Sequence, residues 1–286
     1  MIQEQQIHKP YSLTEQQVEH FQVFGFLIRR KLFSPDEMQQ IQDEFDRRLD
    51  AIQRDAGPKE EHQFDNWPNR NPDSPYLASL LEDPRIYVPS EQLLGPGAVP
   101  VHSNSNSYFE DTPWHPDTTD CHLLTIKNVM YLQRTTPERG ALRVIPGSHQ
   151  SPLYDELRRI GIKGTSGDKP RFFTESGMRA EDIPCHVFSS EPGDLITFNE
   201  RTWHAAFGGY MDRRTCTFNF YSDPRTAAEK EDLRSQAAYY QKSRKSLGTI
   251  GPQYHPWWLS NPGNGARRTR WIEWLDEWGF IEADNR

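Results

Sequence analysis

The sequence predicts a mainly β protein with flanking helices, and three observations lead to this fold class. Residues 99–221 contain short segments rich in β-branched and aromatic residues and separated by turn residues, a pattern typical of a sandwich or barrel. Helical patterns flank this region at residues 14–57 and 227–280. The 8 Trp, 11 Tyr and 15 Phe fit a β-rich core, since aromatic side chains favour strands, or else the walls of a ligand pocket.

The first helices are predicted from local capping signals. Residues 14–17 match a capping box, and Gly25 is placed to end that helix before a short strand at 26–28. Residues 34–37 begin a second helix, with Ser at the N-cap and Pro at the first helical position, and its apolar stripe continues to near Gly57. Both helices are expected to pack their apolar stripes into the core.

Residues 58–95 form a less regular connection. Asparagines and prolines break any periodic pattern in residues 58–75, which predicts a loop that could act as a lid. Residues 76–95 are expected to be partly helical, because Pro84 and Pro89 disfavour one unbroken helix.

Short strands are expected to build the region that follows. They are predicted at residues 123–132, 141–145, 186–188, 195–198 and 215–221. Residues 191–194 form a Pro-Gly turn between two of them. Residues 150–184 interrupt the series and are interpreted as an insertion.

Two further helices are predicted at the end of the chain, at residues 227–247 and 267–280. The second carries Trp271, Trp274 and Trp278 at steps of three and four. We expect this stripe to contact the core or a second copy of the chain, with a ligand contact as the alternative.

The whole chain, residues 1–286, is interpreted as one domain that acts as a monomer or homodimer. Its parts are an N-terminal helical region at 13–95, a β core at 96–224 that contains the insertion 150–184, and C-terminal helices at 225–286.

Composition narrows the classes of partner and the compartment. The 33 Lys and Arg against 41 Asp and Glu give a net charge of −8, which argues against nucleic acid or an anionic membrane as the main partner. No apolar run approaches the roughly 18–20 residues that span a bilayer, and the first residues lack the pattern of a secretory signal. Three separated cysteines without CxxC spacing suit a reducing compartment, so we expect a cytoplasmic protein.

Two histidines and an aspartate form the strongest candidate site. His115 and Asp117 are two residues apart, so at a strand end both can point to one face, and a distant strand can supply His204. Two His and one carboxylate with open positions are typical of non-haem Fe(II) oxygenases. Arg213 and Arg214 follow nine and ten residues after His204, and a guanidinium can hold the far carboxylate of an oxo-acid that chelates the metal.

The sequence resembles the phytanoyl-CoA dioxygenase-like family of Fe(II)/2-oxoglutarate oxygenases over about residues 14–221. The likeness lies in the segments Leu13–Gln16 with Phe21 and Gly25–Leu27, Trp114–Asp117, Gly140–His149, Pro192–Asp194 and Trp203–Phe207. The order of these segments carries the resemblance, because a lone His-x-Asp also occurs by chance.

The resemblance implies a double-stranded β-helix, which is a jelly-roll variant, with packed N-terminal helices. It implies that His115, Asp117 and His204 bind Fe(II) and that an arginine holds the C5 carboxylate of 2-oxoglutarate. The spacing in the family favours Arg214, while Arg213 stays open because strand alternation lets only one of the two face inward.

Other residues near the motifs have less definite roles. Thr118 or Thr119, and Asn104 or Asn106, could hydrogen-bond the cosubstrate. His149 is expected to be structural, His102 and His122 to be solvated or core residues with a place in the pocket as the alternative, and Arg143 either to reach the site or to brace a turn.

The activity implied by the resemblance is a dioxygenase that uses Fe(II), 2-oxoglutarate and O2. It would oxidise, most often by hydroxylation, an unactivated C–H bond of a small-molecule metabolite and release succinate and CO2. Related halogenases lack a carboxylate at the position of Asp117, so its presence favours hydroxylase-type chemistry. A non-catalytic sensor of the same fold and a cupin-like enzyme with another metal are the alternatives. A substrate from secondary metabolism is our preferred hypothesis.

Overall fold

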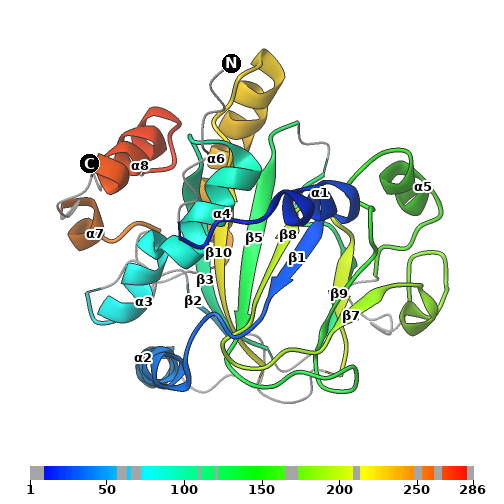
Figure 1. The fold of residues 1–286 in the computed structure, drawn as a ribbon, viewed down its shortest axis with the longest axis horizontal. Coiled ribbons are helices and arrows are strands. Elements are labelled where there is room, and N and C mark those ends of the chain that lie inside the picture. Colours follow the sequence, from blue (N-terminus) through cyan, green and yellow to red (C-terminus); the bar gives the residue numbers. More distant parts are fainter. Residues whose placement is uncertain are drawn as a thin grey trace, which may run out of the picture.

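Two antiparallel sheets pack face to face in the computed structural model, and most helices cover the outer side of the larger sheet (Figure 1). The structure describes residues 10–56, 63–65, 72–108, 111–119, 122–164, 173–208, 213–247, 253–260 and 266–281.

The larger sheet has six strands and the smaller has four. In spatial order the larger contains β1 (Phe26–Arg29), β8 (Leu195–Asn199), β5 (Thr125–Tyr131), β10 (Arg213–Tyr221), β3 (Val99–Tyr108) and β2 (Gln63–Asp65). The smaller contains β4 (Thr112–His115), β9 (His204–Ala206), β6 (Leu142–Val144) and β7 (His186–Phe188). The five strands predicted in the core are all present, and β10 begins two residues earlier than expected.

The connectivity of these strands is that of a jelly roll. From β3 to β6 the chain changes sheet at every step, and it does so again from β7 to β10. All strand pairs are antiparallel. Because side chains alternate along each strand, every core strand has one face toward the opposite sheet and one face away from it.

Three apolar clusters fill the spaces that this arrangement creates. Between the sheets, side chains of the larger sheet such as Val129 and Ile196 meet those of the smaller sheet such as Leu142 and Phe188. A larger cluster lies between the outer face of the six-stranded sheet and the helices. The third cluster includes Trp114 and lies where the insertion 150–184 meets the outer face of the four-stranded sheet.

The helical elements occur largely where the sequence predicts them. They are α1 (Glu15–Phe24), α2 (Pro35–Ala56), α3 (Pro75–Ser79), the 3-10 segment Leu80–Glu82, α4 (Pro84–Leu94), α5 (Leu153–Arg159), the 3-10 segment Ala180–Asp182, α6 (Ala227–Leu247), α7 (Pro256–Ser260) and α8 (Ala266–Glu277). In the part of the chain that the structure describes, none of the helices is long and apolar enough to cross a membrane.

Helix α1 has the predicted capping box. Gln17 N donates to Thr14 Oγ1 at 3.2 Å, and Thr14 N donates to Gln17 Oε1 at 2.9 Å. Gly25 ends the helix with φ at +81°, and its N–H donates to Phe21 O at 2.8 Å. A Cβ at Gly25 would lie 2.5 Å from His149 Nδ1, so the glycine also lets the loop of His149 pack against this helix end.

The connection between α2 and α3 differs in part from the prediction. Within the expected loop 58–75 the structure places the short strand β2, which pairs with the edge of β3. An edge strand offers unpaired backbone groups, and a polar segment that passes it can pair without any apolar pattern of its own. Residues 58–62 and 66–71 of the proposed lid lie outside the described residues.

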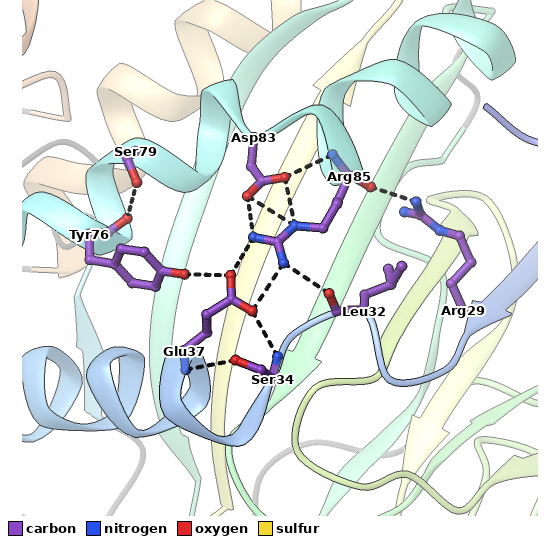
Figure 2. A network of polar contacts seen from close by, with 8 residues as sticks. All are labelled: Arg29, Leu32, Ser34, Glu37, Tyr76, Ser79, Asp83 and Arg85. Carbon is purple, nitrogen blue, oxygen red and sulfur yellow. Dashed lines mark hydrogen bonds and ion pairs between the residues drawn. The ribbon is translucent and has the colours of Figure 1, made fainter. Parts of the chain in front are cut away.

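An ion-pair network fixes the N-terminal helices to one another (Figure 2). Arg85, at the start of α4, donates to Glu37 Oε1 at 2.7 Å and to Asp83 Oδ2 at 2.6 Å, and its Nη1 donates to Leu32 O at 2.9 Å. Tyr76 Oη donates to the Glu37 carboxylate at 3.0 Å. The guanidinium therefore joins the first turns of α2 and α4 to the segment that follows β1.

The C-terminal tryptophans are part of the core. Trp271 is fully buried and its Nε1 donates to Ala98 O at 3.1 Å, while Trp274 donates to Asp223 Oδ1 at 2.8 Å. Both rings pack in the cluster on the outer face of the larger sheet, and Trp278 packs against its edge. The core alternative for this stripe therefore accounts for Trp271 and Trp274.

Candidate metal centre

Three metal-ligating side chains meet where β4 ends and β9 begins. His115 and His204 are register partners in this strand pair, and their ring centroids are 4.3 Å apart. Asp117 lies just beyond β4, with its Oδ1 3.8 Å from His115 Nε2 and its Oδ2 3.6 Å from His204 Nε2. One ligand atom from each residue lies within 4.8 Å of the other two, a spacing that suits a single metal ion.

Backbone carbonyls orient both imidazoles toward this point. His115 Nδ1 lies 2.7 Å from Pro113 O, and His204 Nδ1 lies 2.9 Å from Thr202 O. A carbonyl oxygen can only accept, so each Nδ1 carries the proton and each Nε2 keeps its lone pair for a metal. Asp117 is held differently, because its N–H donates to Glu200 O at 2.8 Å from the turn between β8 and β9.

The protonation states also favour metal binding. Burial lowers the pKa of His204 to about 3, so its imidazole is neutral. Burial is the largest single influence on Asp117 and acts to raise its pKa, but Lys127 and the two imidazoles together outweigh burial and hold that pKa below its ordinary value. The three groups are thus a neutral imidazole, a second imidazole and a carboxylate, which is the donor set that Fe(II) takes in oxygenases.

A pocket extends from these ligands between the two sheets. Its lining comprises Tyr108, Thr112, His115, Asp117, Lys127, Val129, Tyr131, Leu142, Phe198, His204, Ala205, Ala206, Arg213, Thr215 and Thr217. The three candidate ligands lie on one wall and the inner faces of β5 and β10 form the other.

Arg213, the first residue of β10, is a buried cation that lines this pocket. The residue is 4% exposed, its Nη2 donates to Thr112 Oγ1 at 2.8 Å, and its guanidinium carbon lies 4.8 Å from the centroid of the Tyr108 ring. Its Nη1 is buried and has no hydrogen-bond partner among the described residues. A buried guanidinium with an unused donor fits a carboxylate ligand.

This geometry favours Arg213 over Arg214 as the residue that would hold the carboxylate. Arg214 is not among the lining residues, and its Nη1 lies 2.5 Å from Asp46 Oδ1 of α2. Arg213 shares the inner face with Thr215 and Thr217, and alternation turns Arg214 outward. The family spacing from His204 favours Arg214, whereas the register of β10 with its neighbours turns Arg213 toward the pocket.

Gly140 gives Arg213 its space. The glycine has φ at +67°, and a Cβ there would lie 2.8 Å from Arg213 Cδ. Its N–H also donates to Phe207 O at 2.8 Å. The first residue of the segment 140–149 therefore has a direct packing role at the candidate carboxylate site.

The other residues that could bind the cosubstrate differ in their burial and in their position relative to the pocket. Thr118 is buried, and its Oγ1 has no hydrogen-bond partner among the described residues, whereas Thr119 is exposed. Asn104 and Asn106 pair with Thr217 and Thr215, so they share the inner face of the sheet, although neither is among the residues that line the pocket.

The remaining polar candidates have contacts away from the pocket lining. His149 is buried, with Nε2 3.2 Å from Gln22 O. His122 is exposed and its Nδ1 lies 3.2 Å from Asp232 Oδ2. Arg143 donates to Pro137 O at 2.7 Å, which braces the turn before β6. His102 stacks on Tyr240 of α6, with centroids 4.8 Å apart.

A sequence comparison identifies the family. Residues 21–214, about two thirds of the chain, match the sequence profile of phytanoyl-CoA dioxygenase (PhyH). The chain belongs to the phytanoyl-CoA dioxygenase family. A search among curated proteins found no match.

Solved structures resemble this family member over about three quarters of its length. HygX from Streptomyces hygroscopicus, with nickel and 2-oxoglutarate bound, is 20% identical, covers 75% of this chain and 89% of its own, and has a TM-score of 0.55. EctD from S. alaskensis, with 2-oxoglutarate and 5-hydroxyectoine, is 20% identical over 76% of this chain and 83% of its own, with a TM-score of 0.54. SnoK, a non-haem α-ketoglutarate-dependent carbocyclase from nogalamycin biosynthesis, is 16% identical over 73% and 84%, with a TM-score of 0.54.

These findings confirm the predicted fold and cofactors. The fold is a double-stranded β-helix, as the sheet connectivity also shows. The phytanoyl-CoA dioxygenase family uses Fe(II), 2-oxoglutarate and O2, and the His-Asp-His cluster with the buried guanidinium fits the metal and the dicarboxylate. The protein is an Fe(II)- and 2-oxoglutarate-dependent oxygenase.

Two charged residues of this family member's site did not emerge from the sequence. Lys127 of β5 places its Nζ 2.7 Å from Asp117 Oδ2. Burial alone would lower the pKa of Lys127, but the carboxylates of Asp117 and Glu200 raise it, so the ammonium is charged. Glu200 is 2% exposed, and burial followed by the charge of Asp117 raises its pKa to about 7. The available signal for Lys127 was that it is the single charged residue in the predicted strand at 123–132.

Proposed function

We propose that the protein hydroxylates an unactivated C–H bond of a small-molecule metabolite, with His115, Asp117 and His204 as the iron ligands. The observation that carries this proposal is the carboxylate of Asp117, placed between two oriented imidazoles beside the pocket of Arg213. A carboxylate third ligand occupies the position that a halide would need, so hydroxylase-type chemistry is favoured.

We assign different binding roles to the side chains of the pocket. Fe(II) with 2-oxoglutarate supplies the oxidising chemistry, in which O2 is consumed and succinate and CO2 are released. Arg213 receives the far carboxylate of 2-oxoglutarate, and the hydrogen bond to Thr112 and the ring of Tyr108 keep its guanidinium in place. Phe198 and Leu142 contribute apolar surface that limits water next to the metal.

Two structural neighbours support a substrate from secondary metabolism. SnoK comes from nogalamycin biosynthesis, and the EctD structure contains 5-hydroxyectoine. Small molecules of this kind match a pocket enclosed between two sheets. We further propose that the enzyme is cytoplasmic, since Cys185 and Cys216 are free thiols. We also propose that it acts as a monomer or homodimer.

Succinate formation tests the proposed function directly. Anaerobically purified protein is given Fe(II) and 2-oxoglutarate and then exposed to O2, beside the variants His204→Ala and Asp117→Ala. We expect slow succinate release by the wild type without added substrate, and none by either variant, because each lacks a metal ligand. Absence of succinate together with absence of Fe(II) and 2-oxoglutarate binding by calorimetry would contradict the proposal.

The same experiment separates the alternative functions. Binding of Fe(II) and 2-oxoglutarate without any succinate, also in the presence of a broad set of metabolites, is the result expected of a sensor. Activity with Zn(II) or Mn(II) that needs no 2-oxoglutarate is the result expected of a cupin-like enzyme.

A further inference from the structure

A row of polar side chains crosses the inner face of the larger sheet beside the metal ligands. His102, Asn219 and Lys127 are successive register partners on β3, β10 and β5. Lys127 lines the pocket and contacts Asp117, so the row starts at a metal ligand. Asn219, the member of the row on β10, lies six residues from Arg213, which corresponds to about 20 Å in an extended strand. The row is therefore well separated from the candidate site for the 2-oxoglutarate carboxylate.

Glu200 adds a buried carboxylate to this row. It is 2% exposed, and Asn219 Nδ2 donates to its Oε1. Its backbone oxygen accepts from Asp117 N at 2.8 Å and from Thr118 N at 3.2 Å, which places Glu200 directly beside the metal-binding segment. Glu200 thus places a deeply buried carboxyl group directly beside the proposed metal centre, where it is a candidate for binding a ligand.

Two amide oxygens near Glu200 have no hydrogen-bond partner among the described residues. One is Oδ1 of Asn219, whose Nδ2 is used by Glu200, and the other is Oδ1 of Asn104. These residues are 2% and 6% exposed. Asn104 pairs with Thr217, a lining residue of the pocket, so its side chain is on the same face. Buried acceptors without donors are rare in native proteins and indicate a ligand that supplies the donors.

Helix α6 closes the row with an aromatic ring. Tyr240 stacks on His102 at 4.8 Å between centroids and 29° between planes, and its hydroxyl lies 3.2 Å from that of Tyr221. Burial, and next the charge of Glu200, raise the pKa of Tyr240. The row thus has an apolar wall at its far end and the metal ligands at its near end.

We propose that Glu200, Asn219 and Asn104 form the substrate subsite and that it takes a compact, neutral or cationic molecule with several hydroxyl or ammonium donors. This inference rests on the proposed function and names its substrate class. The two amide oxygens can only accept from such a ligand, and the carboxylate of Glu200 accepts in its ionised form. The ammonium of Lys127 is engaged by Asp117, so an anionic substrate would meet Glu200 without compensation from this row. We therefore expect phosphate groups to bind poorly in this subsite.

The test uses probes of matched size and different charge. Wild-type protein loaded with Mn(II) and 2-oxoglutarate, under nitrogen, is titrated with myo-inositol, glucosamine and glucose 6-phosphate, and paramagnetic relaxation of the probe protons by Mn(II) reports binding near the metal. We expect relaxation of the first two probes and none of glucose 6-phosphate. Preferential binding of glucose 6-phosphate would overturn the inference. So would the absence of relaxation of both myo-inositol and glucosamine at concentrations up to about 50 mM, a range that includes weak millimolar complexes.

Two variants assign the effect to the subsite. Glu200→Gln should weaken glucosamine binding roughly ten- to a hundredfold, the usual effect of a lost hydrogen bond to a charged group. Asn104→Leu removes an acceptor that has no partner among the described residues, so this variant should fold normally. We expect it to bind both myo-inositol and glucosamine more weakly. Glu156→Gln is the control, because it removes the same charge from an exposed side chain of α5 that pairs with Arg159. Unchanged probe affinity in Glu200→Gln and Asn104→Leu would also overturn the inference.

Failure of this inference can be told apart from failure of the proposed function. Binding of Mn(II) and then of 2-oxoglutarate is measured first in the same sample, from the relaxation of water protons. If either does not bind, the proposed function fails. If both bind and the probes behave contrary to expectation, only the substrate class is wrong.

Discussion

Arg213 and Arg214 are neighbours in sequence, yet their environments differ completely. Arg213 is 4% exposed inside the pocket, where Gly140 leaves space for its side chain. Arg214 points toward α2, where the side chains of its ion pair with Asp46 are 32% and 48% exposed. The two residues therefore offer a matched pair of variants with the same chemistry on opposite faces of one strand.

We expect Arg213→Met to weaken 2-oxoglutarate binding roughly ten- to a hundredfold, because it removes a hydrogen-bonding charge from a buried carboxylate site. Arg214→Met should leave the Kd unchanged and lower stability by about 1 kcal/mol at most, since its ion pair is partly exposed. Calorimetric titration of 2-oxoglutarate into the Mn(II)-loaded variants gives both values. A larger loss of affinity in Arg214→Met than in Arg213→Met would restore Arg214 as the carboxylate-binding residue.

The sequence could predict the identity of the candidate site residues better than their orientation. His115, Asp117 and His204 are recognisable because their chemistry and order are specific, and the structure brings them within 4.8 Å of one another. Alternation along a strand shows that only one of two adjacent arginines faces inward. Which of the two does so depends on the register of β10 with β3 and β5. Lys127 and Glu200 were missed because their role arises only when β5 and the β8–β9 turn meet Asp117.

At the scale of elements, local signals predicted helix starts, and long-range partners explain the exceptions. Thr14 and Ser34 cap α1 and α2 through residues three positions away, so their patterns are visible in sequence. Ser74 makes no side-chain cap bond at α3. The carboxylate of Glu44, from α2, accepts instead from Tyr76 N at 3.0 Å and Leu77 N at 2.8 Å. No periodic pattern could reveal a cap supplied by another helix.

The Arg85 network predicts an acid-sensitive contact between α2 and α4 (Figure 2). The hydrogen bond from Arg85 is the main cause that lowers the pKa of Glu37 from 4.5 to about 2. A carboxylate whose pKa is lower in the folded protein stabilises it above its unfolded pKa, and this contribution is lost as pH falls from 4.5 toward 2. We expect Glu37→Gln to cost about 1 kcal/mol at pH 7, after allowance for solvent screening, and less at pH 3.

Urea unfolding of wild type and Glu37→Gln at pH 7, 5 and 3 measures this difference. Glu156→Gln serves as the control, because loss of its exposed ion pair with Arg159 should leave the free energy of unfolding almost unchanged at every pH. A difference between wild type and Glu37→Gln that is constant with pH, or that grows toward pH 3, would falsify the assignment of the acid-sensitive contact to Glu37.

At the scale of the whole molecule, the proposed ligands join segments far apart in the chain. His115 and Asp117 belong to the segment around β4, and His204 lies 87 residues after Asp117 at the start of β9. The pocket continues across to Arg213 on the opposite sheet. A metal bound by the first set, and a dicarboxylate shared between that metal and Arg213, would connect the two sheets directly. Both ligands bind only the folded arrangement, so both should stabilise the fold.

This linkage gives an ordered prediction for thermal stability. Mn(II) at about 100 times its Kd should add about 2.7 kcal/mol to the free energy of unfolding, which corresponds to a rise in Tm of very roughly 5–10 °C. 2-Oxoglutarate should add a further increase only when Mn(II) is present, because the metal and Arg213 bind it together. Calorimetric scans with each ligand alone and with both measure the two effects. Asp117→Ala should lose the Mn(II) effect and with it the response to 2-oxoglutarate. A stabilisation by 2-oxoglutarate that is equal with and without Mn(II) would show that the dicarboxylate binds independently of the metal, contrary to the proposed site.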